Sequence, residues 1–258
     1  MRLMKRILSA AAVLALSASL LVGCSSGTAS SVPVSASSAA ESTVSSVEET
    51  ASSAVDENEA AAAQLLNDLT GSYQELWPVI LADEYKQTWL DDCTALVGED
   101  NAEAAFEKLS SMVTGDVYGE DAVKAYANGG GAYFCGFTNS LATLTYDGET
   151  STISGTDKDG NVLFSHTYHY IGMAPVRGLY EFESDDADSG EFTYFFLAPD
   201  TSAETYHIEF RYGSDAEALS QYDAGEYAYW LASGISTDCD QTMIDNCIEL
   251  FCTENLAG

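Results

Sequence analysis

The stretch TYHIEFRYG, residues 205–213, alternates between apolar and polar side chains. Successive side chains of a β-strand point to opposite faces, so the alternation predicts a strand with one apolar and one polar face. The apolar face carries Tyr206, Ile208, Phe210 and Tyr212, and the polar face carries His207, Glu209 and Arg211. An imidazole beside a carboxylate is a pair that can bind zinc. A strand that turns its polar face to solvent shows the same pattern, so the alternation leaves both interpretations open.

Several runs of the same kind precede this stretch and are separated by turn signals such as DGE and DKDGN. They are AYFCGFT (132–138), LATLTYDGE (141–149), TSTISG (150–155), VLFSHTYHYIG (162–172), GLYEFES (178–184) and EFTYFFLAP (191–199). Short strands at this spacing are typical of an antiparallel barrel or sandwich. The second half of the chain is therefore predicted to be one antiparallel β structure.

Helical patterns flank these strands on both sides. Apolar residues recur at helical spacing in 56–69, 82–97, 101–113, 118–131 and 236–254. In the last of these, Met243, Cys247 and Phe251 form one apolar stripe, and Ser236 or Thr237 is the expected N-cap. The fold class predicted is mainly β (α+β), with helices at the N- and C-terminal ends of the β structure.

The N-terminus reads as an export signal. Arg2, Lys5 and Arg6 precede an apolar run that ends in LVGC at Cys24, which is the order of a bacterial lipoprotein signal. We expect a signal peptide at 1–23, a lipidated Cys24 followed by a disordered tether of Ser, Ala and acidic residues to 58, and a domain at 59–258. The alternatives are a plain signal peptide and a membrane helix, for which the apolar run is short.

The chain is strongly acidic. It has 41 acidic and nine basic residues and a formal charge of −32. This charge argues against nucleic acid or an anionic membrane surface as a partner and is compatible with attraction of cations.

Five of the six cysteines follow Cys24, without a C-x-x-C motif. An odd number leaves at least one thiol unpaired in a monomer, so buried free thiols and a disulfide both remain open.

The sequence offers little that indicates catalysis. It has three histidines, His166, His169 and His207, and no nucleophile elbow, phosphate loop or His-Glu-x-x-His motif. On an unbulged strand His166 and His169 point to opposite faces, so they cannot share one site. We therefore expect a binding protein and not an enzyme.

Five segments, in this order, resemble a known family over about residues 64–252. They are LTGSYQELWPVI (69–80), YHYIG (168–172), GLYEFES (178–184), FTYFFLAP (192–199) and HIEFRYGSD (207–215). Together they are similar to the ZinT-type domain, a zinc-binding module of exported proteins and of some zinc-uptake lipoproteins. The resemblance implies an antiparallel lipocalin-like (calycin) β-barrel with flanking helices.

The resemblance also implies a zinc site. The family holds zinc with three histidines, whose positions correspond here to Phe195, His207 and Glu209. Phenylalanine cannot bind a metal, whereas Glu209 can replace a histidine as ligand. His169 is the candidate third ligand, provided that it faces the same barrel interior as His207 and Glu209.

The function implied is that of an extracytoplasmic lipoprotein anchored to the bacterial cell membrane through Cys24. It would bind zinc or another divalent metal ion as a monomer, for scavenging or for delivery to a metal importer. Two alternatives remain. One is a metal-free barrel that binds a small apolar ligand, and the other is a structural or adhesive surface protein.

Overall fold

The computed structural model describes residues 57–175 and 177–257, which fall within one compact unit. The expected signal peptide, Cys24 and most of the tether lie outside the described residues. Within the described part of the chain, no helix is both long enough and apolar enough to cross a membrane.

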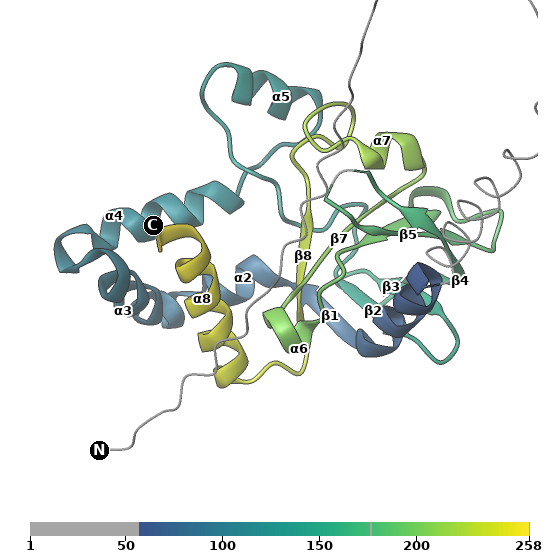
Figure 1. Cartoon of the computed structure of the whole chain (residues 1–258), viewed down its shortest axis with the longest axis horizontal. Helices are drawn as coiled ribbons and strands as arrows, with labels where there is room; N and C mark the ends of the chain where they lie inside the picture. The colour runs from purple at the N-terminus through teal and green to yellow at the C-terminus, as the bar shows by residue number, and fades with distance from the viewer. Residues whose placement is uncertain (1–56, 176, 258) are drawn as a thin grey trace, which may run out of the picture. The chain divides into compact units, whose positions relative to one another are not determined.

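Eight strands form a closed antiparallel barrel in which each strand pairs with its neighbours in sequence and β1 pairs with β8 (Figure 1). They are β1 Gly71–Glu75, β2 Thr143–Asp147, β3 Thr152–Thr156, β4 Val162–Met173, β5 Tyr180–Ser184, β6 Tyr194–Leu197, β7 Ile208–Gly213 and β8 Ala232–Ser236. The predicted mainly-β class and barrel with flanking helices are confirmed.

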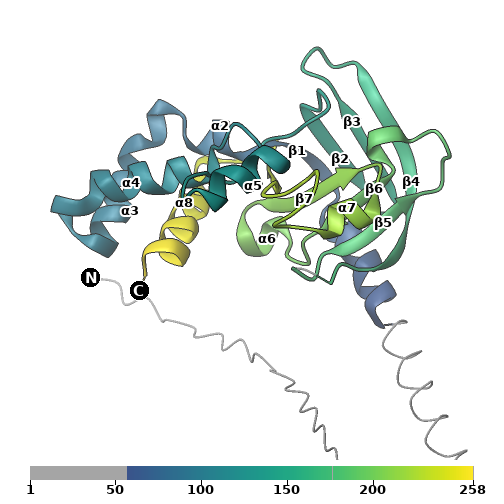
Figure 2. The same ribbon diagram turned by 90° about the horizontal axis from the view of Figure 1, so that it is seen from above.

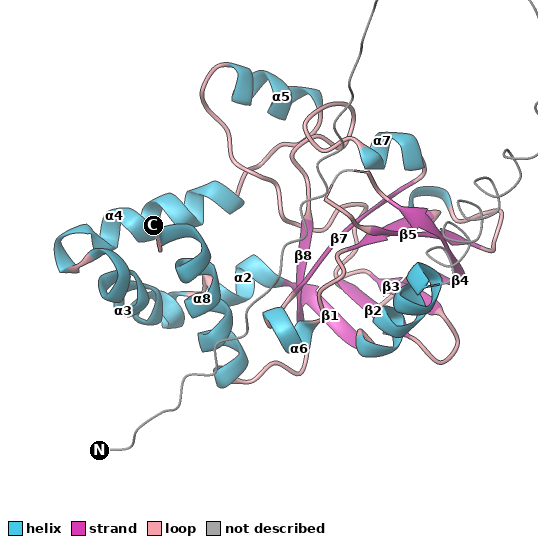
Figure 3. Ribbon diagram, viewed as in Figure 1, coloured by secondary structure: helices cyan, strands magenta, loops and turns pink. Residues whose placement is uncertain are grey.

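Helices lie at the barrel's end and beside it. A helix at 57–68 precedes β1, and its residues Leu65 and Leu66 are buried with the barrel core. The other helices and helical turns are α2 Leu76–Ile80, η1 Asp83–Tyr85, α3 Lys86–Val97, α4 Glu99–Val113, α5 Glu120–Ala127, η2 Gly190–Phe192, α6 Ser202–Thr205, α7 Ala216–Ser220 and α8 Gln241–Leu256. Figures 2 and 3 show α3, α4 and α8 side by side outside the barrel.

Three local predictions are wrong. The run 132–138 is not a strand, because its backbone makes only single bridges, at Phe134 to Thr114 and to Trp230. The strands β1 and β8, with sequences GSYQE and ASGIS, were not predicted, because each contains Gly and only one β-branched or aromatic residue. The N-cap of α8 is Asp240, whose carboxylate accepts a hydrogen bond from the Met243 amide at 2.9 Å.

The barrel interior is filled by its own side chains. Its inward-facing core consists of Tyr73, Leu144, Tyr146, Ile153, Phe164, Tyr168, Phe182, Phe195, Leu197, Ile208, Phe210, Tyr212 and Ala232, all at most 4% exposed. Aromatic rings stack or meet edge to face within this set, as Phe195 does with Tyr212 at 5.3 Å and with Tyr168 at 5.4 Å. Space that a larger barrel would give to an apolar ligand is here occupied by these rings.

A second core forms between the barrel and the helices. It contains Leu76 and Trp77 of α2, Trp89 and Cys93 of α3, and the α8 residues Ile244, Cys247, Ile248 and Cys252, together with Ile235 of β8. Ile235 lies on the outer face of its strand, because its neighbours Ala232 and Gly234 pair with the inward-facing Phe210 and Ile208. The outer face of β8 is therefore covered by helices at Ile235.

Candidate functional site

The two faces of β7 are those that the alternation predicts, but their placement differs from the one implied by the resemblance. Ile208, Phe210 and Tyr212 point into the barrel, and His207 and Glu209 lie on the outer face. The expectation that His207 and Glu209 face the barrel interior is therefore wrong. On β7 the inward positions are taken by Ile208, Phe210 and Tyr212, which pack with the aromatic core, so His207 and Glu209 lie on the other face.

The turn before β7 fixes the position of His207. The short helix α6 ends at Thr205, and Tyr206 then adopts a left-handed conformation with φ 66°. This turn breaks the alternation, so Tyr206 packs with the helical core instead of the barrel core. His207 Nδ1 lies 2.7 Å from the Thr205 carbonyl oxygen. Because a carbonyl only accepts, Nδ1 carries the proton, and Nε2 is the nitrogen left for another partner.

Glu209 faces that second nitrogen. Its Oε1 lies 3.9 Å from His207 Nε2, and its Oε2 lies 3.5 Å from Arg177 Nη2. The side chains of His207 and Glu209 are 19% and 34% exposed. The carboxylate thus sits between two cationic groups at the edge of the covered region.

The opposite charges of His207 and Glu209 stabilise each other. Burial opposes the positive charge of His207, but contacts with Cys247 and then with Glu209 outweigh it and raise the imidazole pKa to about 10. Burial also opposes the charge of Glu209, yet His207 and Arg177 together lower its pKa. Both shifts favour the imidazolium beside the carboxylate, so a metal ion has to displace the proton on Nε2 to bind there.

Two small adjoining pockets surround the pair. The first, about 100 Å³, is lined by Ala198, Asp200, Thr205, His207, Glu209 and Glu254. The second, about 70 Å³, is lined by Leu76, Trp77, His207, Glu209, Cys247, Leu250, Phe251 and Glu254. Two further carboxylates, Asp200 and Glu254, line these pockets with the pair. The thiol of Cys247 lines the second pocket, and its sulfur is 3.9 Å from His207 Nδ1.

The sequence interpretation did not identify these additional neighbours. Cys247 and Glu254 are seven residues apart on α8, which places them on one face of the helix two turns apart. That spacing was a usable signal, because Cys247 had already been assigned to a buried stripe. Asp200 and Arg177 lie in connecting segments, where no periodicity indicates which way a side chain points.

The structure does not bring His169 to this site. It lies on the outer face of β4, which is separated from β7 by β5 and β6 in the barrel order. Its side chain is 53% exposed, and Nδ1 pairs with Asp185 Oδ1 at 2.7 Å. The condition that His169 shares an interior with His207 and Glu209 is not met. His166, as predicted, shares the opposite face with Phe164 and Tyr168, and it pairs with Asp186 at 2.7 Å.

The donor set fits zinc in type but is not fully assembled. Imidazole nitrogen and carboxylate oxygen are zinc ligands, and the Thr205 carbonyl orients the imidazole as outer-shell acceptors do in zinc sites. Among residues 57–175 and 177–257, however, no group of three or more His, Cys, Asp or Glu side chains is arranged to hold a metal ion. His207 and Glu209 are two candidate ligands close together, and a third would have to come from a pocket side chain or from water.

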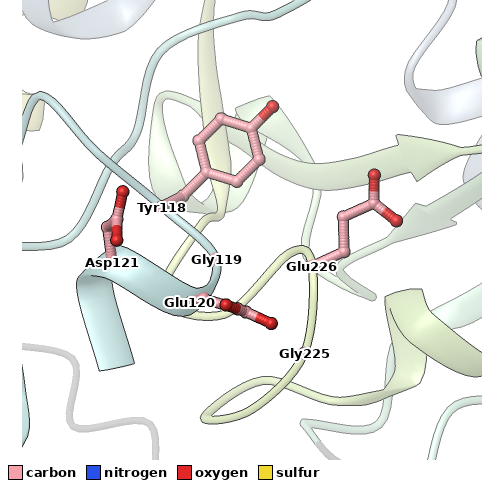
Figure 4. A pocket seen from close by; sticks show the side chains of 6 residues that line it. All are labelled: Tyr118, Gly119, Glu120, Asp121, Gly225 and Glu226. Atoms are coloured by element: carbon pink, nitrogen blue, oxygen red, sulfur yellow. The ribbon is translucent and has the colours of Figure 1, made fainter. Parts of the chain in front are cut away.

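A larger pocket, of about 460 Å³, lies elsewhere (Figure 4). It is lined by Tyr118, Gly119, Glu120, Asp121, Gly225 and Glu226. Figure 4 shows its three carboxylates pointing in different directions around the Tyr118 ring instead of converging on one point. It contains neither histidine nor cysteine, so the pocket at His207 is the better candidate for a metal site.

Fold and site together describe an eight-stranded antiparallel barrel of lipocalin-like type, with an imidazole–carboxylate pair beneath its flanking helices. No family model matches the chain, and no curated protein matches it. Among solved structures it is similar to the Zn(II)-bound ZinT-like domain of Streptococcus pneumoniae AdcA, with 16% identity and a TM-score of 0.45, over 72% of this chain and 89% of that one.

The chain is also similar to the Zn(II)-bound structure of the whole AdcA protein. The identity is 15% and the TM-score 0.42, and the match covers 70% of this chain but only 34% of that one. This chain therefore spans about a third of the length of that protein. At identities and TM-scores this low, neither match assigns a ligand to this chain.

Proposed function

We propose that this chain is an extracytoplasmic lipoprotein that binds zinc, or a related divalent metal ion, at the pocket formed by His207 and Glu209. One observation carries the proposal. His207 Nε2 and Glu209 Oε1 lie 3.9 Å apart, at a pocket that Asp200 and Glu254 also line. The bound metal is cargo for scavenging or for delivery to an importer, and the protein is not an enzyme.

Each residue of the pocket has a distinct role in the proposed metal binding. Thr205 holds the imidazole with Nδ1–H, so Nε2 points toward the pocket. Glu209 supplies the first carboxylate, and the metal competes for it with Arg177. Asp200 and Glu254 add negative charge at the entrance, which attracts a divalent cation. Since only two ligands are in place, part of the coordination shell is left to water and affinity is below that of a three-histidine site.

Zinc calorimetry on the full chain tests the site. In moderate salt, which screens diffuse binding to the many carboxylates, the wild type is expected to bind one zinc ion. His207→Ala removes the one nitrogen ligand and is expected to abolish this stoichiometric binding. Glu209→Gln, which keeps the shape but removes the charge, is expected to weaken binding at least about tenfold.

The matched control for these variants is His169→Ala. His169 also pairs with a carboxylate, Asp185, at 2.7 Å, but it lies on the outer face of β4. The His169→Ala variant should therefore bind zinc as the wild type does. Absence of a stoichiometric site in the wild type would refute the proposed function, and unchanged zinc binding in His207→Ala would refute the proposed pocket.

The anchor is tested separately from the metal. If Cys24 is lipidated after removal of 1–23, Cys24→Ala is expected to move the protein from the membrane fraction to the soluble exported fraction. The thermal unfolding midpoint of the domain should stay the same, because Cys24 precedes its first described residue by more than thirty positions. Fractionation followed by immunoblotting measures the shift, and a variant that remains with the membrane would indicate a retained membrane helix instead.

A further inference from the structure

Two thiols meet in the core between α3 and α8. Cys93 lies on α3 and Cys252 on α8, and both are 0% exposed. Their sulfur atoms are 3.9 Å apart. The aromatic ring of Trp89, one turn before Cys93, packs against Phe251 beside Cys252 at 6.0 Å. The two helices are therefore held in register where the thiols face each other.

The other described cysteines have different surroundings. Cys247 faces His207, and Cys135 lies beside Ser233 and Trp77. Cys239 is half-buried in the segment before α8. Cys239 and Cys247 are near enough to interact electrostatically. Among the described cysteines, however, the sulfur–sulfur contact of 3.9 Å is between Cys93 and Cys252, so this pair is the preferred product of oxidation in the folded arrangement.

We propose that Cys93 and Cys252 form a disulfide in the exported protein, which ties the C-terminal helix α8 to α3. A disulfide has a sulfur–sulfur distance of about 2.05 Å. Closing the 3.9 Å contact to that length moves the two sulfurs by about 2 Å in total, which side-chain rotation shared between two cysteines supplies. Export places the chain where disulfides form and persist.

The reaction is thiol–disulfide exchange with an oxidant that is itself a disulfide, either oxidised glutathione or a disulfide-bearing oxidoreductase. The thiolate of one cysteine attacks a sulfur of the oxidant, breaks its S–S bond and forms a mixed disulfide with release of one thiolate. The second cysteine's thiolate attacks the protein-side sulfur of that mixed disulfide, forms the Cys93–Cys252 bond and releases the other thiolate. The two protein thiols are oxidised, and their two protons end on the two reduced thiols of the oxidant.

Burial sets when the reaction takes place. Both sulfurs are enclosed by the helical core, and burial raises the pKa of Cys93. An oxidant reaches them while α8 has not yet docked, so the bond forms during folding after export. Once formed it closes a loop between positions 159 residues apart and restricts the unfolded chain. It also fixes α8, which carries Cys247 and Glu254 of the metal pocket. The disulfide rests on the export that the proposed function includes, but it does not depend on metal binding.

The test is a peptide map of the full chain, unfolded and then refolded with oxidised and reduced glutathione. Remaining thiols are alkylated under denaturing conditions, and the protein is digested with a protease that cleaves at acidic residues. Mass spectrometry is expected to find one linked peptide pair that contains Cys93 and Cys252. The thermal midpoint of the oxidised protein should exceed that of the reduced protein by about 10 °C.

Variants separate this pair from the other thiols. Cys93→Ala and Cys252→Ala should each abolish the linked pair and the difference in midpoint, whereas Cys239→Ala should leave both unchanged. Complete alkylation of Cys93 and Cys252 in the refolded wild type would overturn the proposal, and so would a dominant link between other cysteines. Because the wild-type map needs no variant, the test stands even if an alanine variant does not fold.

Discussion

Arg211→Ala is expected to destabilise the protein by about 3–5 kcal/mol, the largest loss that we expect from a single truncation. Arg211 lies on the outer face of β7 and is 2% exposed. Its guanidinium donates to the carbonyl oxygens of Leu219, of Gln221 at 3.2 Å and of Tyr227 at 2.5 Å. All three carbonyls belong to the connection between β7 and β8, so this one side chain holds that connection against the barrel.

The size of the expected loss follows from these partners. Hydrogen bonds to charged groups contribute about 1.5–3 kcal/mol each to stability. Without the guanidinium, the three carbonyl oxygens would also be left without this donor in a region covered from solvent. The variant also gains some stability, because it no longer buries a charged group, but this gain is smaller than the loss. The cost of that burial shows in the pKa of Arg211, which burial lowers to about 10, and in Nε, which has no partner within the described residues. Removing the side chain therefore relieves part of a desolvation cost but leaves several unsatisfied acceptors.

Denaturant unfolding measures this effect, with two comparison variants. Arg211→Lys keeps a cation but cannot reach three carbonyls at once, so an intermediate loss is expected. Lys124→Ala removes an exposed lysine that pairs with Glu120 and Asp121, and little change is expected. A free energy of unfolding of Arg211→Ala within about 1 kcal/mol of the wild type would mean that the β7–β8 connection does not depend on the guanidinium.

The second large effect is expected at Phe195. The resemblance to ZinT-type domains places a metal-binding histidine at this position, but the side chain here points into the barrel. Phe195 is 0% exposed and packs against Phe164, Tyr168, Phe210 and Tyr212. His207 and Glu209 lie on the outer face of the neighbouring strand. A metal on the outer face is therefore out of reach of a side chain at position 195.

Phe195→His is consequently expected to cost about 2–4 kcal/mol of stability without tightening zinc binding. The loss combines missing aromatic packing with the burial of an imidazole among apolar rings. Phe195→Leu, which loses ring contacts but adds no polar group, should cost less. Unfolding and zinc calorimetry on the two variants separate the effects. Tighter zinc binding by Phe195→His would contradict the face assignment and place the metal in the barrel.

The local sequence pattern predicted much of the architecture. Period-two alternation in 141–213 identified six strands of the barrel, and helical spacing identified α3, α4, α5 and α8. The division of β7 into a face with Ile208, Phe210 and Tyr212 and a face with His207 and Glu209 was also correct. These features depend on side-chain periodicity, which is set by the backbone of a single element.

Weak local signals explain what was missed. The strands β1 and β8 each contain Gly and only one β-branched or aromatic residue. They are strands because they close the barrel against each other and against β2 and β7. AYFCGFT has the composition of a strand, but its segment runs past Trp230 with single bridges instead of joining the sheet. Pairing partners distant in sequence decided both outcomes, as is general for β structure.

The amino-acid sequence by itself therefore determined that β7 has an apolar and a polar face, and that His207 and Glu209 lie side by side on the polar one. Only the tertiary structure decided that this face is outside the barrel, that α8 brings Cys247 and Glu254 to it, and that His169 is elsewhere. The physical reason is volume. The barrel interior is filled by aromatic and aliphatic side chains, so the polar pair lies at the boundary with the helices. Its neighbours there come from segments that no local pattern connects to β7.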